Sequence, residues 1–158
     1  MRENDIHTKA GILLHDANQR YTQGRKRLIA TLYRSGRPVS IHQILDLEPD
    51  LPQSSIYRNL DALEQSKVID RIALKSGIYY ELSESFLGHH HHMVCLSCDT
   101  VIDVELSATD EGIVDRILDN TSRIHNFVPT HHILDIQGFC EPCISQIESE
   151  TSSGDEKL

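Results

Sequence analysis

Four cysteines, arranged as two Cys-x-x-Cys pairs, place the strongest constraint on how this chain folds. The first pair is Cys95 and Cys98, and the second pair, Cys140 and Cys143, follows after 41 intervening residues. Four thiolates satisfy a tetrahedral zinc ion completely, so a site of this composition is structural rather than catalytic. The residues between the pairs must therefore form a unit that brings both pairs together, and we predict a structural Zn²⁺ site there.

The cellular compartment bears on this prediction because disulfides compete with zinc thiolates. The chain has no apolar window of about 20 residues, so we expect no membrane span. The first residues are polar and acidic and lack the apolar segment of a secretory signal. We therefore expect a cytoplasmic protein, in whose reducing surroundings zinc thiolates are favoured over disulfides.

Charge divides the chain into two halves. Residues 1–84 carry 12 basic and 11 acidic side chains, whereas residues 85–158 carry 3 and 13. The strongly acidic second half repels phosphate, whereas the nearly neutral first half, which carries most of the basic residues, does not. This difference in net charge indicates two domains with different partners. We expect domains at 1–84 and 85–145, followed by a disordered acidic tail at 146–158.

The first domain has the element order of a winged helix-turn-helix. Apolar residues recur at helical spacing in segments 6–17, 25–35, 41–45 and 52–66, and two strand-like runs joined through Gly77 follow at 68–74 and 78–82. Thr22 and Ser40 are the expected N-caps of the second and third helices. A helix-turn-helix places its second helix in the major groove of DNA, so the helix at 52–66 is the expected reading helix.

Polar side chains at the start of the reading helix are the expected DNA contacts. Ile56, Leu60 and Leu63 face the core, which leaves the outward face to Gln53, Ser54, Ser55, Tyr57 and Arg58. These side-chain types hydrogen-bond phosphates or base edges, and arginine grips guanine with two bonds. Arg25 and Lys26, in a basic triplet at the start of the preceding helix, are the expected phosphate contacts.

Four consecutive histidines, His89 to His92, precede the first cysteine pair. On a strand, side chains alternate between faces, so His89 and His91 point one way and His90 and His92 the other. One run thus feeds two separate sites. Carboxylates in reach are Asp70, Glu81, Asp103, Glu105 and Asp115, and His131 and His132 open a predicted strand at 132–137. Such mixed ligands suit Fe²⁺, Mn²⁺, Ni²⁺ or Zn²⁺.

Three stretches together resemble the ferric uptake regulator family of metal-dependent bacterial repressors. They are Ser55-Ile56-Tyr57-Arg58-Asn59-Leu60, the run from His89 to Cys98, and Gly138-Phe139-Cys140-Glu141-Pro142-Cys143. The resemblance implies an α+β chain: an N-terminal winged helix-turn-helix domain, then a small α/β dimerisation domain with the structural four-cysteine zinc site. It also implies a homodimer that binds double-stranded DNA at a palindromic operator, under control of a corepressor metal.

The same resemblance assigns ligands to two regulatory sites. The sensor site takes Glu81, His90 and His92, with Asp103 and Asp70 as further ligands in some branches of the family. The second site takes His89, His91, Asp115 and His132. Pro38 stands where many iron and peroxide sensors have a histidine, and no cysteine precedes the histidine run as in many zinc sensors. The sensed metal therefore stays open between zinc and iron, ahead of manganese and nickel.

Two alternatives belong to other functional classes. A metal-dependent hydrolase using the histidine and carboxylate ligands needs an open metal position and a general base. The chain lacks a His-Glu-x-x-His pattern, a Gly-x-Ser-x-Gly pattern and a phosphate loop. A metal-buffering protein needs no winged helix. A metal-responsive repressor accounts for both halves of the sequence.

Overall fold

The chain divides into two compact units, which a computed structural model describes for residues 2–152. The first unit is Met1–His89 and the second is His90–Leu158. The division lies beyond the boundary expected after residue 84, because a short helix, α5 (Glu84–Leu87), buries Phe86 in the core of the first unit.

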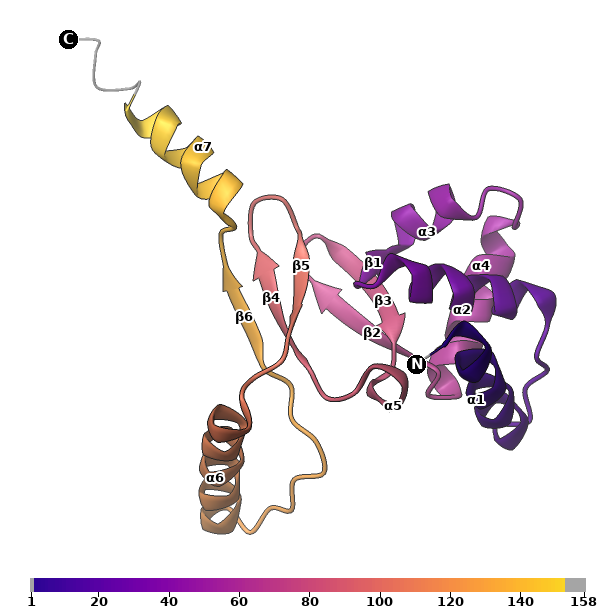
Figure 1. The fold of residues 1–158 in the computed structure, drawn as a ribbon, viewed down its shortest axis with the longest axis horizontal. Helices are drawn as coiled ribbons and strands as arrows, with labels where there is room; N and C mark the ends of the chain where they lie inside the picture. Colours follow the sequence, from indigo (N-terminus) through magenta and orange to yellow (C-terminus); the bar gives the residue numbers. More distant parts are fainter. Residues whose placement is uncertain (1, 153–158) are drawn as a thin grey trace. The chain divides into compact units, whose positions relative to one another are not determined.

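The first unit combines helices with an antiparallel sheet of order β1-β3-β2 (Figure 1). Its elements before α5 are, in chain order, α1 (Glu3–Asp16), α2 (Gln23–Ser35), β1 (Val39–Ser40), α3 (Ile41–Leu47), α4 (Gln53–Gln65), β2 (Ile69–Leu74) and β3 (Gly77–Leu82). Helices α3 and α4 form the predicted helix-turn-helix, and the β2–β3 hairpin forms the wing. Strand β1 was not predicted, since two residues carry no detectable alternation.

Local capping explains where the helices of this unit begin. The Thr22 hydroxyl accepts a hydrogen bond from the backbone of Arg25, as predicted for an N-cap. Ser40 and Gln43 form a reciprocal capping box at the start of α3. Gly36, in the left-handed conformation with φ +57°, ends α2.

One apolar core holds the first unit together. Its fully buried side chains include Leu14 of α1, Ile29 of α2, Ile56 and Leu60 of α4, and Leu82 of β3. The core therefore fixes α4 by the face that helical periodicity predicted and leaves the opposite face exposed.

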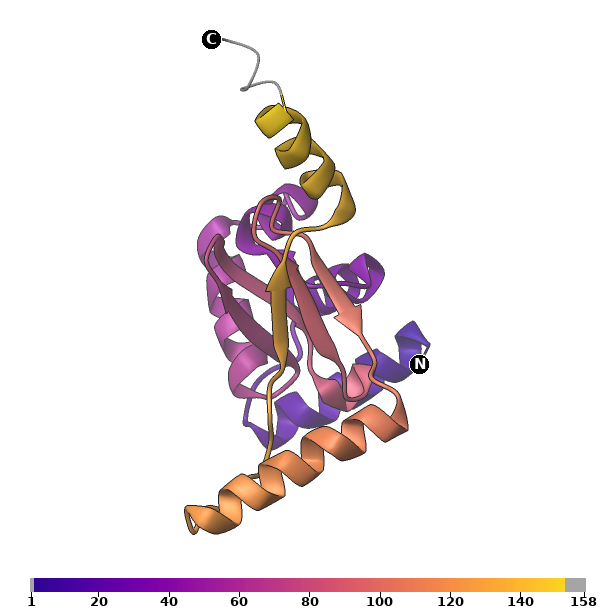
Figure 2. The ribbon, with the colours of Figure 1, turned by 90° about the vertical axis from the view of Figure 1, so that its left-hand side faces the viewer.

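The second unit is a three-stranded sheet of order β5-β4-β6. Its elements are β4 (His91–Cys95), β5 (Val101–Val104), α6 (Ala108–Ile124), β6 (Asp135–Gly138) and α7 (Glu141–Ser152). The central strand β4 pairs antiparallel with β5 and parallel with β6. Both ribbon views place α6 at one end of this sheet and α7 at the other (Figures 1 and 2).

Little apolar surface is buried within the second unit. Among its described residues, the buried ones are His91, His92, Val94, Cys95, Val101 and Cys143. Helix α6 has no buried residue, although it carries the large apolar side chains Ile113 and Ile117. This unit therefore depends on ligands or partners more than the first unit does.

Two expectations for the C-terminal third need correction. The strand expected at 132–137 begins at Asp135, because that residue is the first that pairs with β4. The tail expected to be disordered from residue 146 is helical through Ser152 in α7. The remainder of that predicted tail, 153–158, lies outside the described residues.

Candidate metal centres and nucleic-acid interface

The two cysteine pairs converge at the same end of the second unit. The four Sγ atoms all lie within 4.8 Å of one another; they belong to Cys95, Cys98, Cys140 and Cys143. The sulfurs of Cys98 and Cys140 are 3.6 Å apart, so the group joins the two pairs across their long sequence separation. Cys95 ends β4 and Cys98 follows that strand, whereas the second pair follows β6. The parallel pairing of the two strands brings the pairs together.

Backbone donors prepare this group for metal binding. The Cys140 N–H donates to the sulfur of Cys95 at 3.3 Å, and this bond is the main reason that the pKa of Cys95 falls to about 6. The Thr100 hydroxyl, 3.1 Å from the sulfur of Cys98, lowers the pKa of that thiol. For Cys140, the Cys143 N–H favours the thiolate, but the neighbouring thiols and burial outweigh it and raise the pKa to about 12. Full ionisation of all four thiols therefore requires a cation, which a closed four-thiolate zinc site supplies.

Strand β4 divides the histidine run between two faces. His91 points to α6, where its Nε2 lies 3.0 Å from Glu111 Oε2. His92 instead faces Asp103 and Asp135 on the neighbouring strands. The His90 ring packs edge-on against His92, with 5.1 Å between centroids. The alternation that strand geometry predicts is therefore present for these three residues.

Glu111 joins His91 to His132 in the first of these groups. Its other oxygen, Oε1, lies 3.3 Å from His132 Nε2, and the two imidazole rings stack with centroids 5.4 Å apart. Asp115 was predicted as the carboxylate here, but it is exposed and lies outside the group. Glu111 stands one helical turn earlier on the same face of α6, so spacing alone did not separate the two carboxylates.

Asp103 completes the second group within this unit. Ligand atoms of His90, His92 and Asp103 lie within 4.8 Å of one another. Two imidazoles and a carboxylate are borderline ligands that suit Fe²⁺, Zn²⁺, Mn²⁺ or Ni²⁺. Since both groups mix nitrogen with oxygen and contain no sulfur, they differ in chemistry from the cysteine group and fit a regulatory divalent metal.

Three other predicted ligands belong to the first unit. Glu81 is buried on β3, and Asp70 stands directly opposite it on β2, where it is exposed. His89 ends the unit, with its Nδ1 2.8 Å from Glu84 Oε1.

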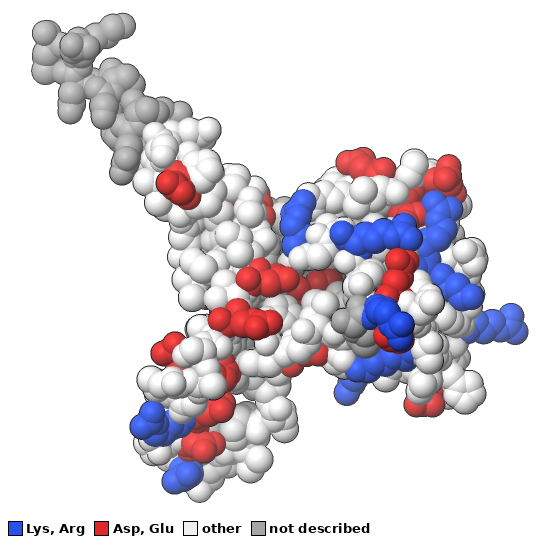
Figure 3. Space-filling view, viewed as in Figure 1, with Lys and Arg blue, Asp and Glu red and all other residues white. Residues whose placement is uncertain are grey.

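The predicted reading face of α4 is exposed. Gln53, Ser54, Tyr57 and Arg58 are exposed, and Ser55 is half-buried. The Arg58 guanidinium folds back along its own helix, with Nε 3.2 Å from the Ser54 carbonyl oxygen. In Figure 3 the Lys and Arg side chains gather mainly on the first unit. The exposed face thus offers polar groups to a nucleic acid.

Two arginines of the basic triplet at 25–27 are engaged within the protein. Arg25 donates to Gln19 Oε1 at 2.8 Å and to the Arg20 carbonyl, and burial lowers the pKa of its guanidinium. Arg27 pairs with the buried carboxylate of Glu48 at 2.7 Å. Lys26 is exposed, with its ammonium over the ring of Tyr21. Of the two predicted phosphate contacts, Lys26 is therefore displayed to solvent, and Arg25 mainly anchors the loop before α2.

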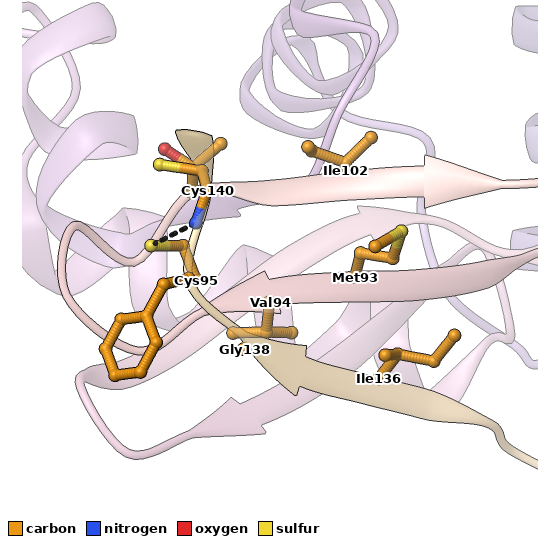
Figure 4. Close-up of a pocket in the computed structure, with 9 residues that line it drawn as sticks. Met93, Val94, Cys95, Ile102, Ile136, Gly138 and Cys140 are labelled. Carbon is orange, nitrogen blue, oxygen red and sulfur yellow. Dashed lines mark hydrogen bonds between the residues drawn. The ribbon is translucent and has the colours of Figure 1, made fainter. Parts of the chain in front are cut away.

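An apolar face of the second sheet lies beside the cysteine group. Figure 4 shows Met93, Ile102 and Ile136 side by side across β4, β5 and β6, next to Cys95 and Cys140. All three apolar side chains are more than two-fifths exposed. The alternation at 132–137 predicted one strand here. It did not predict the apolar face, because sequence alone does not show which face of a sheet a partner covers.

Comparison with known proteins places this arrangement. The profile of the ferric uptake regulator family matches residues 16–137. A ferric uptake regulation protein of Campylobacter upsaliensis is 32% identical over 138 residues, which cover 83% of this chain and 84% of the relative. The fold resembles the Helicobacter pylori ferric uptake regulator, with TM-score 0.72, 22% identity and coverage of 91% of this chain and 95% of that one. It also resembles a zinc uptake regulator solved with zinc and DNA, with TM-score 0.61, 20% identity and coverage of 94% and 99%.

A winged helix joined to a metal-ligand domain defines a metal-responsive, DNA-binding transcriptional regulator. The profile match spans most of the chain, and the Campylobacter relative is 32% identical over 84% of its own length. The chain belongs to the ferric uptake regulator family, whose members are transcription regulators and not enzymes. The hydrolase alternative is therefore set aside. Among the described residues, no helix has the length and apolar character needed to cross a membrane.

Proposed function

We propose that this chain is a homodimeric repressor that occupies a palindromic operator when a regulatory divalent metal, zinc or iron, fills the sensor site. The observation that carries the proposal is the division of the histidine run by β4 into two groups, each with its own carboxylate. The Helicobacter pylori relative has three functional metal-binding sites, which matches the number of ligand groups assigned here.

The sensor site in this proposal contains His90, His92 and Asp103 of the second unit and Glu81 of the first. A metal held by ligands from both units ties them across residues 82–89. Two reading helices must stand about 34 Å apart to enter successive major grooves. Metal binding therefore selects a competent arrangement from those available to the metal-free dimer. Asp70, which pairs with Glu81 in the first unit, is a further ligand candidate.

The second regulatory site contains His91, Glu111 and His132, with His89 as a fourth ligand. Glu111 takes the place predicted for Asp115, because it contacts both histidines. The cysteine group holds a structural zinc ion. DNA as a partner and reduced thiolates as ligands both favour the cytoplasm.

Homodimerisation is supported by the apolar surface of the second unit. Ile117 and Ile124 of α6 are 58% and 77% exposed, and the sheet face of Met93, Ile102 and Ile136 is also uncovered. A self-complementary contact would bury such surface. Each protomer of the dimer then contributes one α4 helix to one half of the palindrome. The expected DNA contacts on that helix are Gln53, Ser54, Ser55, Tyr57 and Arg58, and Lys26 is the expected phosphate contact.

The test is a metal titration of operator binding by fluorescence anisotropy. We expect Glu81→Ala, His90→Ala, His92→Ala and Asp103→Ala each to abolish the metal response while the cysteine-bound zinc and the dimer are kept. His91→Ala is the matched control on the other face of β4, with a smaller effect. If His91→Ala loses the response and His92→Ala keeps it, the sensor is the other site.

The metal itself is identified by a separate measurement. The donor set of imidazole and carboxylate binds both Zn²⁺ and Fe²⁺, and availability decides between them in the cell. We expect protein purified from its native host to contain one zinc per chain plus zinc or iron at the sensor site. Manganese or nickel in its place would overturn the choice.

A further inference from the structure

His92 stands between two carboxylates, one for each of its ring nitrogens. Its Nδ1 lies 3.3 Å from Asp135 Oδ1, and its Nε2 lies 4.0 Å from Asp103 Oδ1. The His92 imidazole is about 10% exposed, so it is largely shielded from solvent. Asp103 belongs to the group of metal ligands, whereas Asp135 does not. Asp103 is therefore a candidate metal ligand beside His92, whereas Asp135 contacts the other ring nitrogen without belonging to the ligand group.

Strand pairing places both carboxylates. His92 pairs with Asp103 across β5 and with Asp135 across β6, so an acidic residue lies directly opposite it on each neighbouring strand. At the other end of β6, Gly138 pairs with Cys95, and its carbonyl accepts the Leu96 N–H at 2.7 Å. The register of β6, and with it the position of Asp135, is therefore held at both ends.

We propose that Asp135 is a positioning residue of the sensor site, which accepts the Nδ1–H of His92 and thereby presents Nε2 to the metal. A neutral imidazole carries its proton on one nitrogen and a lone pair on the other. Nδ1 is within hydrogen-bond reach of Asp135, so the proton resides there and the lone pair of Nε2 faces His90 and Asp103. A carboxylate behind a ligating histidine fixes its tautomer and ring orientation and raises its basicity.

This role differs from that of a direct ligand. Asp135 contacts the ring edge that faces away from Asp103, so it acts through His92. The inference rests on the proposed sensor function of His92, and it adds to that function a carboxylate that no ligand group contains. Asp135 is the first residue of β6, and the sequence pattern predicted a strand there. The same pattern assigned no functional role to the Asp135 carboxylate.

The test measures zinc and Mn²⁺ binding to the full-length protein by calorimetry, with the cysteine zinc in place. We expect Asp135→Ala to weaken binding at the sensor site by about 10- to 100-fold, as for other carboxylates behind a metal-bound histidine. Asp135→Asn keeps an acceptor oxygen without the charge and should lose less. Gln137→Ala, an exposed polar residue two positions along the same strand, is the matched control and should bind as the unaltered protein does.

Nitrogen-15 NMR of histidine-labelled protein gives a readout that a merely structural role would not move. Before the sensor metal is added, His92 should show its proton on Nδ1 in the unaltered protein and in Gln137→Ala, and a mixture of tautomers in Asp135→Ala. Unchanged tautomer and affinity in Asp135→Ala would overturn the proposal. Loss of an oxygen ligand from the metal in that variant, seen by X-ray absorption, would overturn it by making Asp135 a ligand.

A parallel His92→Ala variant separates this inference from the proposed function. If His92→Ala retains sensor-site binding, the proposed sensor is wrong. If His92→Ala loses binding while Asp135→Ala retains it with an unchanged tautomer, the role of Asp135 alone is wrong.

Discussion

Several charged residues of the first unit form ion pairs and hydrogen bonds within the protein, although their residue types are typical of a solvent-exposed surface. Arg27 and Arg25 lie beside Lys26 in one basic triplet, yet both arginines have acceptors within the protein. Glu48 is the partner of Arg27 and also accepts from Thr31, so it joins α2 to the end of α3. The residue types at 25–27 predicted phosphate contacts. Counting charges does not show which acceptors within the protein each guanidinium binds, because those acceptors belong to other residues along the chain.

Replacing Glu48 with alanine should destabilise the first unit. The Glu48 side chain is 8% exposed and its loss leaves Arg27 and Thr31 without that carboxylate, so we expect about 2–3 kcal/mol less unfolding free energy. Asp50 contacts the same Arg27 at 3.5 Å but is 82% exposed, and Asp50→Ala should cost about 0.5 kcal/mol or less. Urea unfolding measures both, and equal losses would contradict the importance of burial.

Two arginines predicted to contact DNA should separate into different roles. Arg58→Ala removes an exposed group from α4, so operator binding should weaken by about 1–3 kcal/mol with little change in stability. Arg25→Ala removes the donor to Gln19, so unfolding free energy should fall by about 1–2 kcal/mol. Anisotropy and urea unfolding on both variants give the comparison. A stable Arg25→Ala protein with weakened DNA binding would restore Arg25 as a phosphate contact.

Secondary-structure elements differ in how far sequence reveals them. The helices of the first unit follow from apolar periodicity and caps such as Thr22 and Ser40, because both signals are local. The two faces of β4 follow from strand geometry. The choice of Glu111 over Asp115 does not, since the two share a helix face. Nor does the start of β6, which depends on where β4 offers a partner, or α5, whose four residues show no period.

The short helix α5 gives a test of where the first unit ends. Phe86 is buried in the core that α1 and α2 line, so Phe86→Ala should lower unfolding free energy by about 3 kcal/mol. For the same reason a fragment of residues 1–84 should be less stable than one of residues 1–89. Leu87→Ala, at an exposed position of the same helix, is the control. Fragments of equal stability would move the boundary back to residue 84.

The whole molecule combines one unit with an apolar core and another with little buried carbon. In the first unit the core includes side chains from α1 through α5. In the second, two of the buried side chains are cysteines of the zinc group and two are histidines of the regulatory groups. We therefore expect metal ligation to supply in the second unit much of the stabilisation that packing supplies in the first.

Stripping zinc with a strong chelator should unfold the two units unequally. Structural zinc contributes on the order of 10 kcal/mol in small domains, so we expect amides of β4, β5 and β6 to lose protection from hydrogen exchange. Amides of α2 and α4, which the core covers, should keep theirs. Cys95→Ser/Cys140→Ser should reproduce the pattern without chelator. If the double variant keeps its zinc and its protected sheet, the four cysteines are not the structural site.

The histidine run also has a consequence for how the gene can change. Removal of any one of the four histidine codons yields the same protein. Counted back from Cys95, the positions of His92, His91 and His90 keep their histidines, and Gly88 moves into the place of His89. Such a deletion falls before β4, at a glycine whose φ of +90° already marks a bend. His90, His91 and His92 are therefore replaced by histidine on both faces, and the loss is confined to His89, the fourth ligand proposed for the second regulatory site.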